Sequence, residues 1–247
     1  QENILLRRRL LQAEDAASPV RQARADSQVE NMTKLLGLKN RQLEGSFRAL
    51  EQSHKELEQA HHRTIRYYVN TVLTVARFYE AHDPYFGGHA QAVASCAVPV
   101  AQAMGWKEER LDPLRTAAYL IFFGNIGVPY RVLHQEGPLT EAQWKIVRTH
   151  PRVARQIIEP IGPLTEAVVW IAQHHERPDG KGYPEGLSGD GIAPAARILH
   201  AAEAYVAMRS TRPYRGPLPA GRILEEMRAG SGTQFDPKVV EAWEAWW

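Results

Sequence analysis

The sequence predicts an all-α protein in which a long helix precedes a helical bundle. Between residues 26 and 80 there is no proline and there are only two glycines, which favours one long helix. From residue 83 onward, segments with helical periodicity alternate with short loops rich in glycine and proline, and strand patterns are absent. We therefore expect an N-terminal helical, coiled-coil dimerisation segment, residues 1–66, followed by a globular domain, residues 67–247.

The composition is typical of a soluble globular protein, with 44% hydrophobic and 23% charged residues. A net charge of +2 is too small to favour nucleic acid or a membrane surface as a partner. The single cysteine, Cys96, excludes a disulfide framework and points to a reducing cytoplasm; we interpret it as a small buried residue. No apolar run approaches the roughly 20 residues of a membrane span. The chain begins at Gln1 rather than methionine, so upstream domains stay open.

The first helical pattern covers residues 3–16, where leucines give one apolar side. Ser18 and Pro19 follow directly. Because proline lacks an N–H group and suits the first turn of a helix, we expect a break at this point.

The next stretch carries the seven-residue repeat of a coiled coil. The d positions are all leucine: Leu36, Leu43, Leu50 and Leu57. The a positions are mostly polar: Asn40, Phe47, His54 and His61. The e positions include three glutamates: Glu44, Glu51 and Glu58. A buried asparagine at a favours one register in a dimer. We expect a parallel homodimer through this coil; the alternative is a lone helix that packs on its own domain with a solvated glutamate face.

Beyond residue 61 the apolar row shifts by four residues, which is a stutter. The new row is Ile65, Tyr68, Val72, Val75 and Tyr79. We expect the helix to leave its partner here and to pack on the globular core.

The remaining helices of the bundle are expected at residues 89–104, 108–123, 140–147, 151–159, 163–175, 194–209, 217–229 and 236–246. The glycine-rich stretch 180–192 suggests a short hairpin. Three tryptophans near the end fall on one helical face, where core or interface packing is expected: Trp243, Trp246 and Trp247.

The chemistry-bearing stretch is HHERPDGKGYP, residues 174–184, in which two adjacent histidines precede a glycine-rich turn. Two other histidines stand near helix starts: His89 follows DPYFGG, and His150 precedes a proline. Neutral imidazole is a common ligand of transition metals. A single histidine in such a setting would be read as a surface or cap residue, but the order and neighbours of these residues favour a metal site.

The stretch from about residue 67 to 245 resembles the HD-GYP family, the bacterial cyclic-di-GMP phosphodiesterase branch of the HD superfamily. HHERPDGKGYPEGLSG is similar to the GYP signature. Three further blocks are similar to family blocks in order: LTEAQWKIVRTHPRVARQII, RILHAAEAYVAMRSTRPYR and GTQFDPKVV. The resemblance implies an HD-GYP helical bundle with a two- or three-metal centre built from several helices.

The resemblance also implies the metal ligands, of which this chain keeps a remnant: His89, His150, His174, His175 and Glu203. Glu203 stands in place of an aspartate. The family segment Leu-His-Asp-Ile-Gly-Lys-Ile-Gly reads LIFFGNIG here. Ile121 thus replaces the histidine, Phe122 the metal-bridging aspartate and Asn125 the lysine. Val206 replaces a second aspartate of the later block.

These replacements bear directly on catalysis. Two metal ions held close together without a bridging anion repel each other strongly, and phenylalanine offers no ligand atom. The first metal would keep only His89 and Glu203. The second would keep the three other histidines, which with a water could hold zinc tetrahedrally. We therefore expect no cofactor, or one Zn, Mn or Fe ion at the three-histidine remnant.

Contacts to a dinucleotide are partly kept. By resemblance, Tyr183, Arg212 and Arg215 match ligand-binding positions, and two arginines three residues apart could grip phosphates if RPYR is helical. The alternative is that RPYR is a solvent-facing helix end. Asn125 removes a cation that would hold phosphate.

Three functions stay open. The first is a catalytically inactive cytoplasmic signalling or scaffold module that dimerises and docks an unknown regulatory protein. The second is a receptor that binds cyclic-di-GMP without hydrolysing it. The third is a phosphodiesterase with residual activity from an unusual site. The lost aspartate and histidine favour the first two, and the lost lysine favours the first over the second.

Overall fold

The computed structural model describes residues 2–81, 87–211 and 216–247 and contains two compact units, Gln1–Arg63 and Thr64–Trp247. The described residues form α-helices, short 3-10 helices and loops, and the only β-type pairing among them is one isolated bridge between Ser231 and Phe235. The all-α prediction is confirmed. No helix in the described part of the chain is long and apolar enough to span a membrane.

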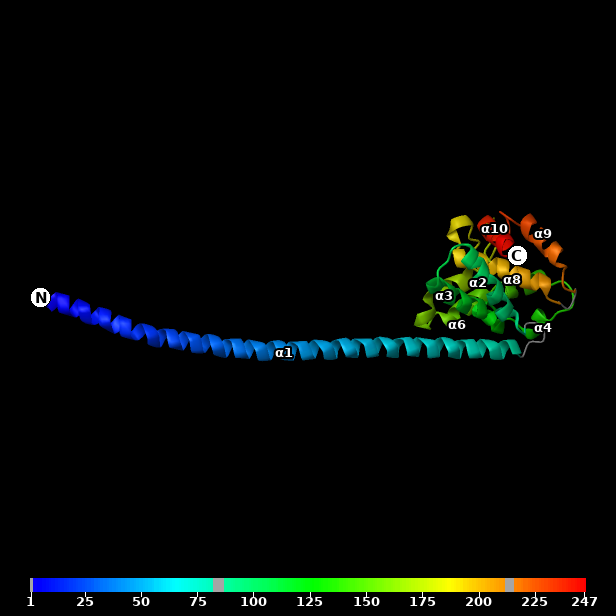
Figure 1. Ribbon diagram of the computed structural model, residues 1–247. Helices are drawn as coiled ribbons and strands as arrows, with labels where there is room; N and C mark the ends of the chain where they lie inside the picture. The colour runs from blue at the N-terminus through cyan, green and yellow to red at the C-terminus, as the bar shows by residue number, and fades with distance from the viewer. Residues whose placement is uncertain (1, 82–86, 212–215) are drawn as a thin grey trace. The chain divides into compact units, whose positions relative to one another are not determined.

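The long N-terminal helix is α1 (Glu2–Ala81), which runs without interruption past Pro19 (Figure 1). The predicted break at Ser18 and Pro19 is therefore wrong. A proline inside a helix removes one hydrogen bond, at a cost of about 3 kcal/mol, but the helix can continue on both sides of it. Pro99 and Pro113 likewise lie inside helices of the globular unit.

In the globular unit, every helix predicted from the sequence is present, with ends within a few residues of those expected. The α-helices are α2 (His89–Ala103), α3 (Glu108–Leu120), α4 (Tyr130–Leu133), α5 (Glu141–Val147), α6 (His150–Ile158), α7 (Thr165–Gln173), α8 (Pro194–Arg209), α9 (Ala220–Ala229) and α10 (Pro237–Trp246). The 3-10 helices are η1 (Ile121–Gly127), η2 (Gly162–Leu164) and η3 (Gly189–Gly191).

Three local features differ from the prediction. Residues 121–123 do not extend α3 but begin the 3-10 helix η1, which changes the direction of their side chains. The four-residue helix α4 was not predicted. The hairpin at residues 180–192 is wrong, because this stretch forms turns and η3 instead. Glycines with left-handed backbone at 180, 186 and 189 bend the chain too often for two strands to pair.

The core of the globular unit is built around α2, which contacts α3, α8 and α10, while α7 contacts α3, α6 and α8 (Figure 1). Its largest fully buried side chains include Leu111, Leu120, Ile171, Leu199 and Trp243. Trp243 packs against Tyr205 in the core, as the sequence suggested. The two tryptophans that follow Trp243 are partly exposed.

The last turns of α1 belong to this globular unit, as the shifted apolar row predicted. The residues that pack on the core are Val69, Val72, Leu73 and Ala76, at the spacing of one helical face. The predicted row is off by about one residue, since Tyr68 and Val75 are largely exposed.

Candidate functional site

The structure brings together the three histidines that the sequence assigned to one metal. His150 begins α6, and His174 and His175 follow the last residue of α7. One ring nitrogen of each lies within 4.8 Å of the others. The Nε2 atoms of His150 and His174 are only 3.3 Å apart. The contact of α6 with α7 thus converts two distant sequence stretches into one cluster.

Backbone carbonyls fix the orientation of two of these rings. His150 Nδ1 donates to the Val147 carbonyl at 2.8 Å, and His174 Nδ1 donates to the Ile171 carbonyl. Because Nδ1 carries the proton in both rings, each Nε2 presents a lone pair to the other. Two facing lone pairs repel unless a cation lies between them, and this is the arrangement that metal-binding histidines adopt.

Burial keeps the histidines neutral, which is the form that binds metal. Burial lowers the pKa of His150 to about 4. It also lowers the pKa of His174 and His175 well below the usual value, and the charge that a protonated neighbour would carry lowers both further. The cluster is therefore poised to accept a cation at neutral pH.

Glu203 on α8 supplies a carboxylate beside the cluster. Its Oε2 atom lies 3.6 Å from the Nε2 atoms of His174 and His175. Zinc bonds of about 2.0–2.1 Å would separate tetrahedral donors by about 3.4 Å, which is close to these two spacings. The group of ligand atoms that lie within 4.8 Å of one another nevertheless consists of the three histidines, with Glu203 beside it. The resemblance assigned Glu203 to the other metal, whereas the structure places it beside the three histidines.

His89 lies outside this cluster of ligand atoms. Its Nε2 is 2.9 Å from the Ser210 hydroxyl, and its ring meets the edge of Phe122 at 6.2 Å between centroids. The predicted first metal site therefore has an aromatic ring against its histidine. Ile121, at the position where the family has a further ligand, is fully buried and apolar, and Glu203, the other expected ligand, contacts the three-histidine cluster.

The 3-10 helix η1 places Phe122 in this position. Gly124 lets η1 approach α6 closely, since a Cβ at residue 124 would lie 1.9 Å from the carbonyl oxygen of His150. Side chains on a 3-10 helix point about 120° apart, so Phe122 and Phe123 cannot face the same way. Both rings belong to the hydrophobic core of the globular unit, and of the two only Phe122 also lines the pocket beside His150.

The loop after His175 is folded back on itself by Glu176, which is buried. Its Oε1 accepts hydrogen bonds from the N–H groups of Glu185 and Gly186, and its Oε2 accepts one from Leu187. Gly182 packs so closely that a Cβ there would lie 2.5 Å from the His175 carbonyl oxygen. The loop is thereby held against the histidine cluster.

Tyr183, at the centre of this loop, stacks on the His175 ring with centroids 4.6 Å apart. Burial, together with the negative charge of Glu203, raises the pKa of its hydroxyl above the usual value. Tyr183 therefore stays protonated and can donate a hydrogen bond to a ligand.

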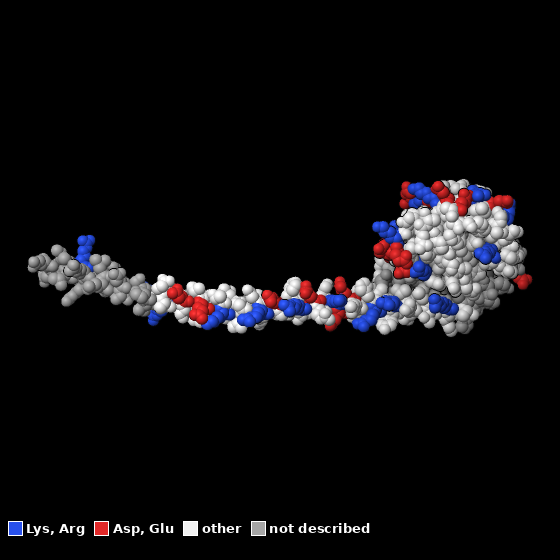
Figure 2. Space-filling model, in the orientation of Figure 1, with Lys and Arg blue, Asp and Glu red and all other residues white. Residues whose placement is uncertain are grey.

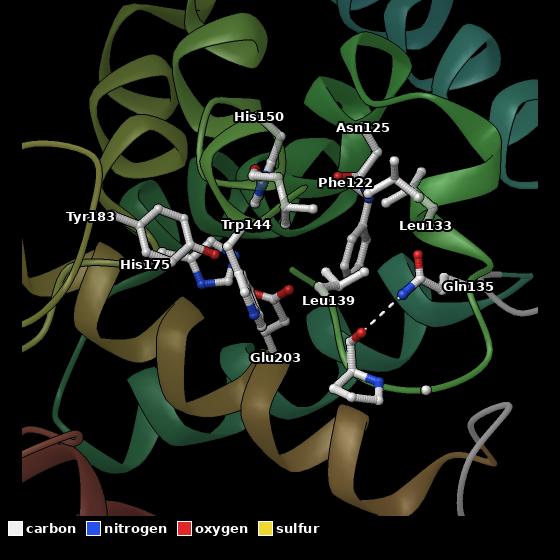
Figure 3. A pocket seen from close by; sticks show the side chains of 14 residues that line it. Phe122, Asn125, Leu133, Gln135, Leu139, Trp144, His150, His175, Tyr183 and Glu203 are labelled. Carbon is white, nitrogen blue, oxygen red and sulfur yellow. Dashed lines mark hydrogen bonds and ion pairs between the residues drawn. The ribbon is translucent and has the colours of Figure 1, made fainter. Parts of the chain in front are cut away.

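A pocket of about 590 Å³ opens beside the cluster (Figure 3). Figure 3 shows Phe122 on one side of it and His175 with Tyr183 on the other, above Glu203. The remaining wall comes from the loop between α4 and α5 and from Trp144. Among the described lining residues, Glu203 is the only one with a charged side chain. Asn125 lines the pocket at the position that the resemblance matched to a lysine. The asparagine side chain is uncharged, so this position offers no positive charge to a phosphate.

Two predicted ligand contacts, Arg212 and Arg215, lie outside the described residues. Three residues that shape the site were missed by the sequence analysis. Glu176 lies in HHERPDGKGYP and Trp144 in LTEAQWKIVRTHPRVARQII, two stretches that are similar to family motifs, but no sequence pattern assigned either residue a role. His200 donates from Nδ1 to the His174 carbonyl at 2.9 Å, so it supports the backbone of the cluster. Its position one turn before Glu203 on α8 was the available signal.

Comparison with known proteins places these features in a family. Residues 74–239 match the HD domain family. The chain is 32% identical over 176 residues to 3'3'-cGAMP-specific phosphodiesterase 3 of Vibrio cholerae serotype O1, a match that covers 71% of this chain and 38% of the relative. It is 33% identical over 174 residues to the cyclic di-GMP phosphodiesterase response regulator RpfG of Xanthomonas campestris, which covers 70% of this chain and 46% of the relative. The chain thus spans less than half of these relatives.

Solved structures agree in fold. Bd1817, an HDG"Y"P protein from Bdellovibrio bacteriovorus, superposes with a TM-score of 0.56 at 18% identity. The superposition covers 72% of this chain and 59% of that protein. The helical bundle, the histidine cluster and the matched residues 74–239 lead to one assignment: the chain belongs to the HD domain family, in its HD-GYP branch.

Proposed function

We propose that this chain is a non-hydrolytic HD-GYP module that acts in signalling through protein contacts and binds at most one metal ion. The observation that carries the proposal is the position of the Phe122 ring, which lies against His89 and lines the pocket beside His150 and His175. Two neighbouring metal ions would need a bridging carboxylate between them. The position matched to that carboxylate holds Phe122, whose aromatic ring offers no ligand atom.

The three histidines would hold the single ion, with the Glu203 carboxylate beside them. Its chemistry there would be that of a Lewis acid, or of a structural ion that ties α6, α7 and α8 together. The chain's own residues already hold the donor atoms in place through the carbonyls of Val147 and Ile171. Metal binding therefore requires little rearrangement of the cluster.

Two measurements test this proposal together. Purified protein is incubated with cyclic-di-GMP and added manganese or iron, and the products are separated by chromatography; we expect no linear dinucleotide or GMP above the enzyme-free blank. Elemental analysis after dialysis against zinc should give at most one ion per chain, and His174→Ala should reduce it to background. Product release, or two ions per chain, would overturn the proposal.

A second candidate, a non-hydrolytic receptor for a cyclic dinucleotide, is favoured by the pocket itself. Trp144 and Tyr183 offer aromatic surfaces to a nucleobase, since bases stack well on aromatic side chains. The described lining carries only the negative charge of Glu203, which repels phosphate. Binding of a dinucleotide should therefore depend on a bound metal ion or on arginines beyond the described residues.

Calorimetric titration of the wild-type protein with cyclic-di-GMP, with zinc and with EDTA, tests the second candidate. We expect binding that is at least tenfold weaker in EDTA and in Trp144→Ala. Trp246→Ala is a matched control, because Trp246 and Trp144 are similarly exposed at 37% and 39% and Trp246 is absent from the pocket lining. If titration of cyclic-di-GMP in the presence of zinc gives no heat of binding, the receptor function is excluded and the scaffold function is left.

A further inference from the structure

Helix α1 carries a stripe of large apolar side chains that are exposed to solvent within the unit Gln1–Arg63. We call it the d stripe; it consists of Val29, Leu36, Leu43, Leu50 and Leu57. Their exposed fractions lie between 57% and 68%. Five apolar residues at intervals of seven form one continuous line along a helix. Such a line can stay in contact with a second helix when the two helices cross at a shallow angle and supercoil. The repeat therefore extends one heptad further towards the N-terminus than the leucines alone.

We propose that the occupant of the d stripe is a second copy of this chain, which binds in parallel and in register. Burial of exposed apolar surface against an identical stripe is favourable by roughly 25 cal/mol per Å². The spacing of seven residues matches a two-stranded coil, in which the stripe of one helix meets the same stripe of the other. The proposal does not depend on the histidine site.

The distribution of polar residues selects the parallel arrangement. The a positions of the same heptads include Asn40, His54 and His61. In a parallel dimer, a faces a and d faces d, so leucines meet leucines and the polar residues meet each other. In an antiparallel dimer a faces d, so the leucines would face Asn40, His54 or His61 in most layers and Phe47 in one. Separation of the two kinds of layer favours the parallel pair.

Charge complementarity points the same way. In a parallel dimer, position g of one helix faces position e of the next heptad of the other, so Lys39 faces Glu44 of the second copy. In an antiparallel dimer, e faces e, which would bring glutamates at 44, 51 and 58 against one another. Figure 2 shows basic and acidic residues following one another along the helix. Within one helix, Lys34 at position b pairs with Glu30 at position e at 2.6 Å.

Disulfide trapping tests both orientation and register. In a Cys96→Ser background, the full chain is made with Leu36→Cys at a d position alone, with His61→Cys at an a position alone, and as a mixture of the two, because an antiparallel pair brings d of one helix against a of the other. A parallel in-register dimer should give covalent dimers of each variant alone under mild oxidation. Disulfides that form only in the mixture would show an antiparallel pair, and an absence of disulfides in all three samples would show that the stripe has no second copy; either result overturns the proposal.

Light scattering on the full chain supplies the second test. The wild type should show twice the chain mass of 27.8 kDa, and Leu43→Ala with Leu50→Ala should show a single chain mass at the same concentration. Leu35→Ala with Leu38→Ala is the matched control, since both leucines are exposed on α1, at 54% and 60%, but lie off the stripe. The control should remain dimeric. A wild type with the mass of one chain, or a control that dissociates equally, would contradict the assignment.

Discussion

At the scale of single residues, the site is defined by which side chain faces the three histidines. The ring of Phe122, which the resemblance matched to a bridging carboxylate, lines the pocket with His150 and His175. Phe123, its neighbour, packs in the core. Both side chains are buried, at 5% and 8% exposed, so composition and burial alone cannot tell them apart. Only their directions differ.

This difference gives a prediction for metal rescue. Phe122→Asp would place a carboxylate beside the histidines, whereas Phe123→Asp would bury one in the core without a partner. Both changes should lower the melting temperature in EDTA, because a large core side chain is lost, at about 3–5 kcal/mol, and a charge is buried. Added zinc should restore the melting temperature of Phe122→Asp alone. The prediction fails if zinc affects the two variants equally.

A second residue-scale prediction concerns Glu176. Its buried carboxylate accepts three backbone hydrogen bonds, and Gln in its place could present only one oxygen, so at least one of these N–H groups would lose its partner. We expect Glu176→Gln to cost about 1–3 kcal/mol of the free energy of unfolding, measured by urea denaturation.

Glu185→Gln is the control for Glu176, because it lies in the same loop but pairs with Arg152 in an exposed ion pair. Such a pair contributes about 0–1 kcal/mol. Equal losses in the two variants would show that Glu176 does not organise the loop.

At the scale of elements, the close approach of η1 to α6 decides the geometry of the site. The sequence predicts helix through residue 123, but α3 ends at Leu120 and η1 begins at once. The tighter 3-10 geometry turns Phe122 toward the pocket. Gly124 permits the contact, since its missing side chain leaves room for the backbone of α6.

Gly124→Ala should therefore destabilise the globular unit. The added methyl group would meet the backbone of His150 and Ala154, and neither can move without shifting α6. Overpacking of this kind costs about 1–3 kcal/mol, which thermal unfolding followed by circular dichroism would detect. It should also weaken zinc binding, because His150 begins α6.

The matched control is Gly221→Ala in α9, where a Cβ meets nothing within 4 Å. Alanine is the better helix former there, by up to about 1 kcal/mol, so no loss of stability is expected. A variant Gly124→Ala as stable as the wild type would refute the close contact between η1 and α6.

At the scale of the whole molecule, the buried histidines couple the stability of the globular unit to pH. Burial lowers the pKa of His150 and of His200 to about 4, and it lowers the pKa of His174 and His175 well below the usual value. In the unfolded chain these residues take up protons near pH 6.5. Between the two values the unfolded state binds more protons, so the stability that is fully present above pH 6.5 is lost as the pH falls toward 4.

The apoprotein in EDTA should lose stability steeply between pH 6.5 and 5. His150 and His200 each contribute on the order of 3 kcal/mol over their full window, and most carboxylates are still ionised above pH 5. Urea midpoints measured at half-unit steps of pH would show the slope. A flat profile between pH 6.5 and 5 would contradict the burial of neutral histidines.

The sequence by itself determined the all-α class and the order of the helices, which depend on local periodicity and on glycine and proline in loops. Its resemblance to the HD-GYP family, rather than any local pattern, placed His150 with His174 and His175. The sequence also led us to interpret Ile121, Phe122 and Asn125 as replacements of family residues, because a motif can be compared without coordinates.

The tertiary structure decided how the site is assembled. Glu203 lies beside the three-histidine cluster and His89 does not, because the packing of α8 against α7 and the Phe122 ring set those positions. The continuation of α1 through Pro19 and the start of η1 at Ile121 were likewise outside the reach of local patterns. Periodicity reports which residues share a face. Distances between side chains on different helices depend on how closely the backbones pack, and at Gly124 that depends on a single missing methyl group.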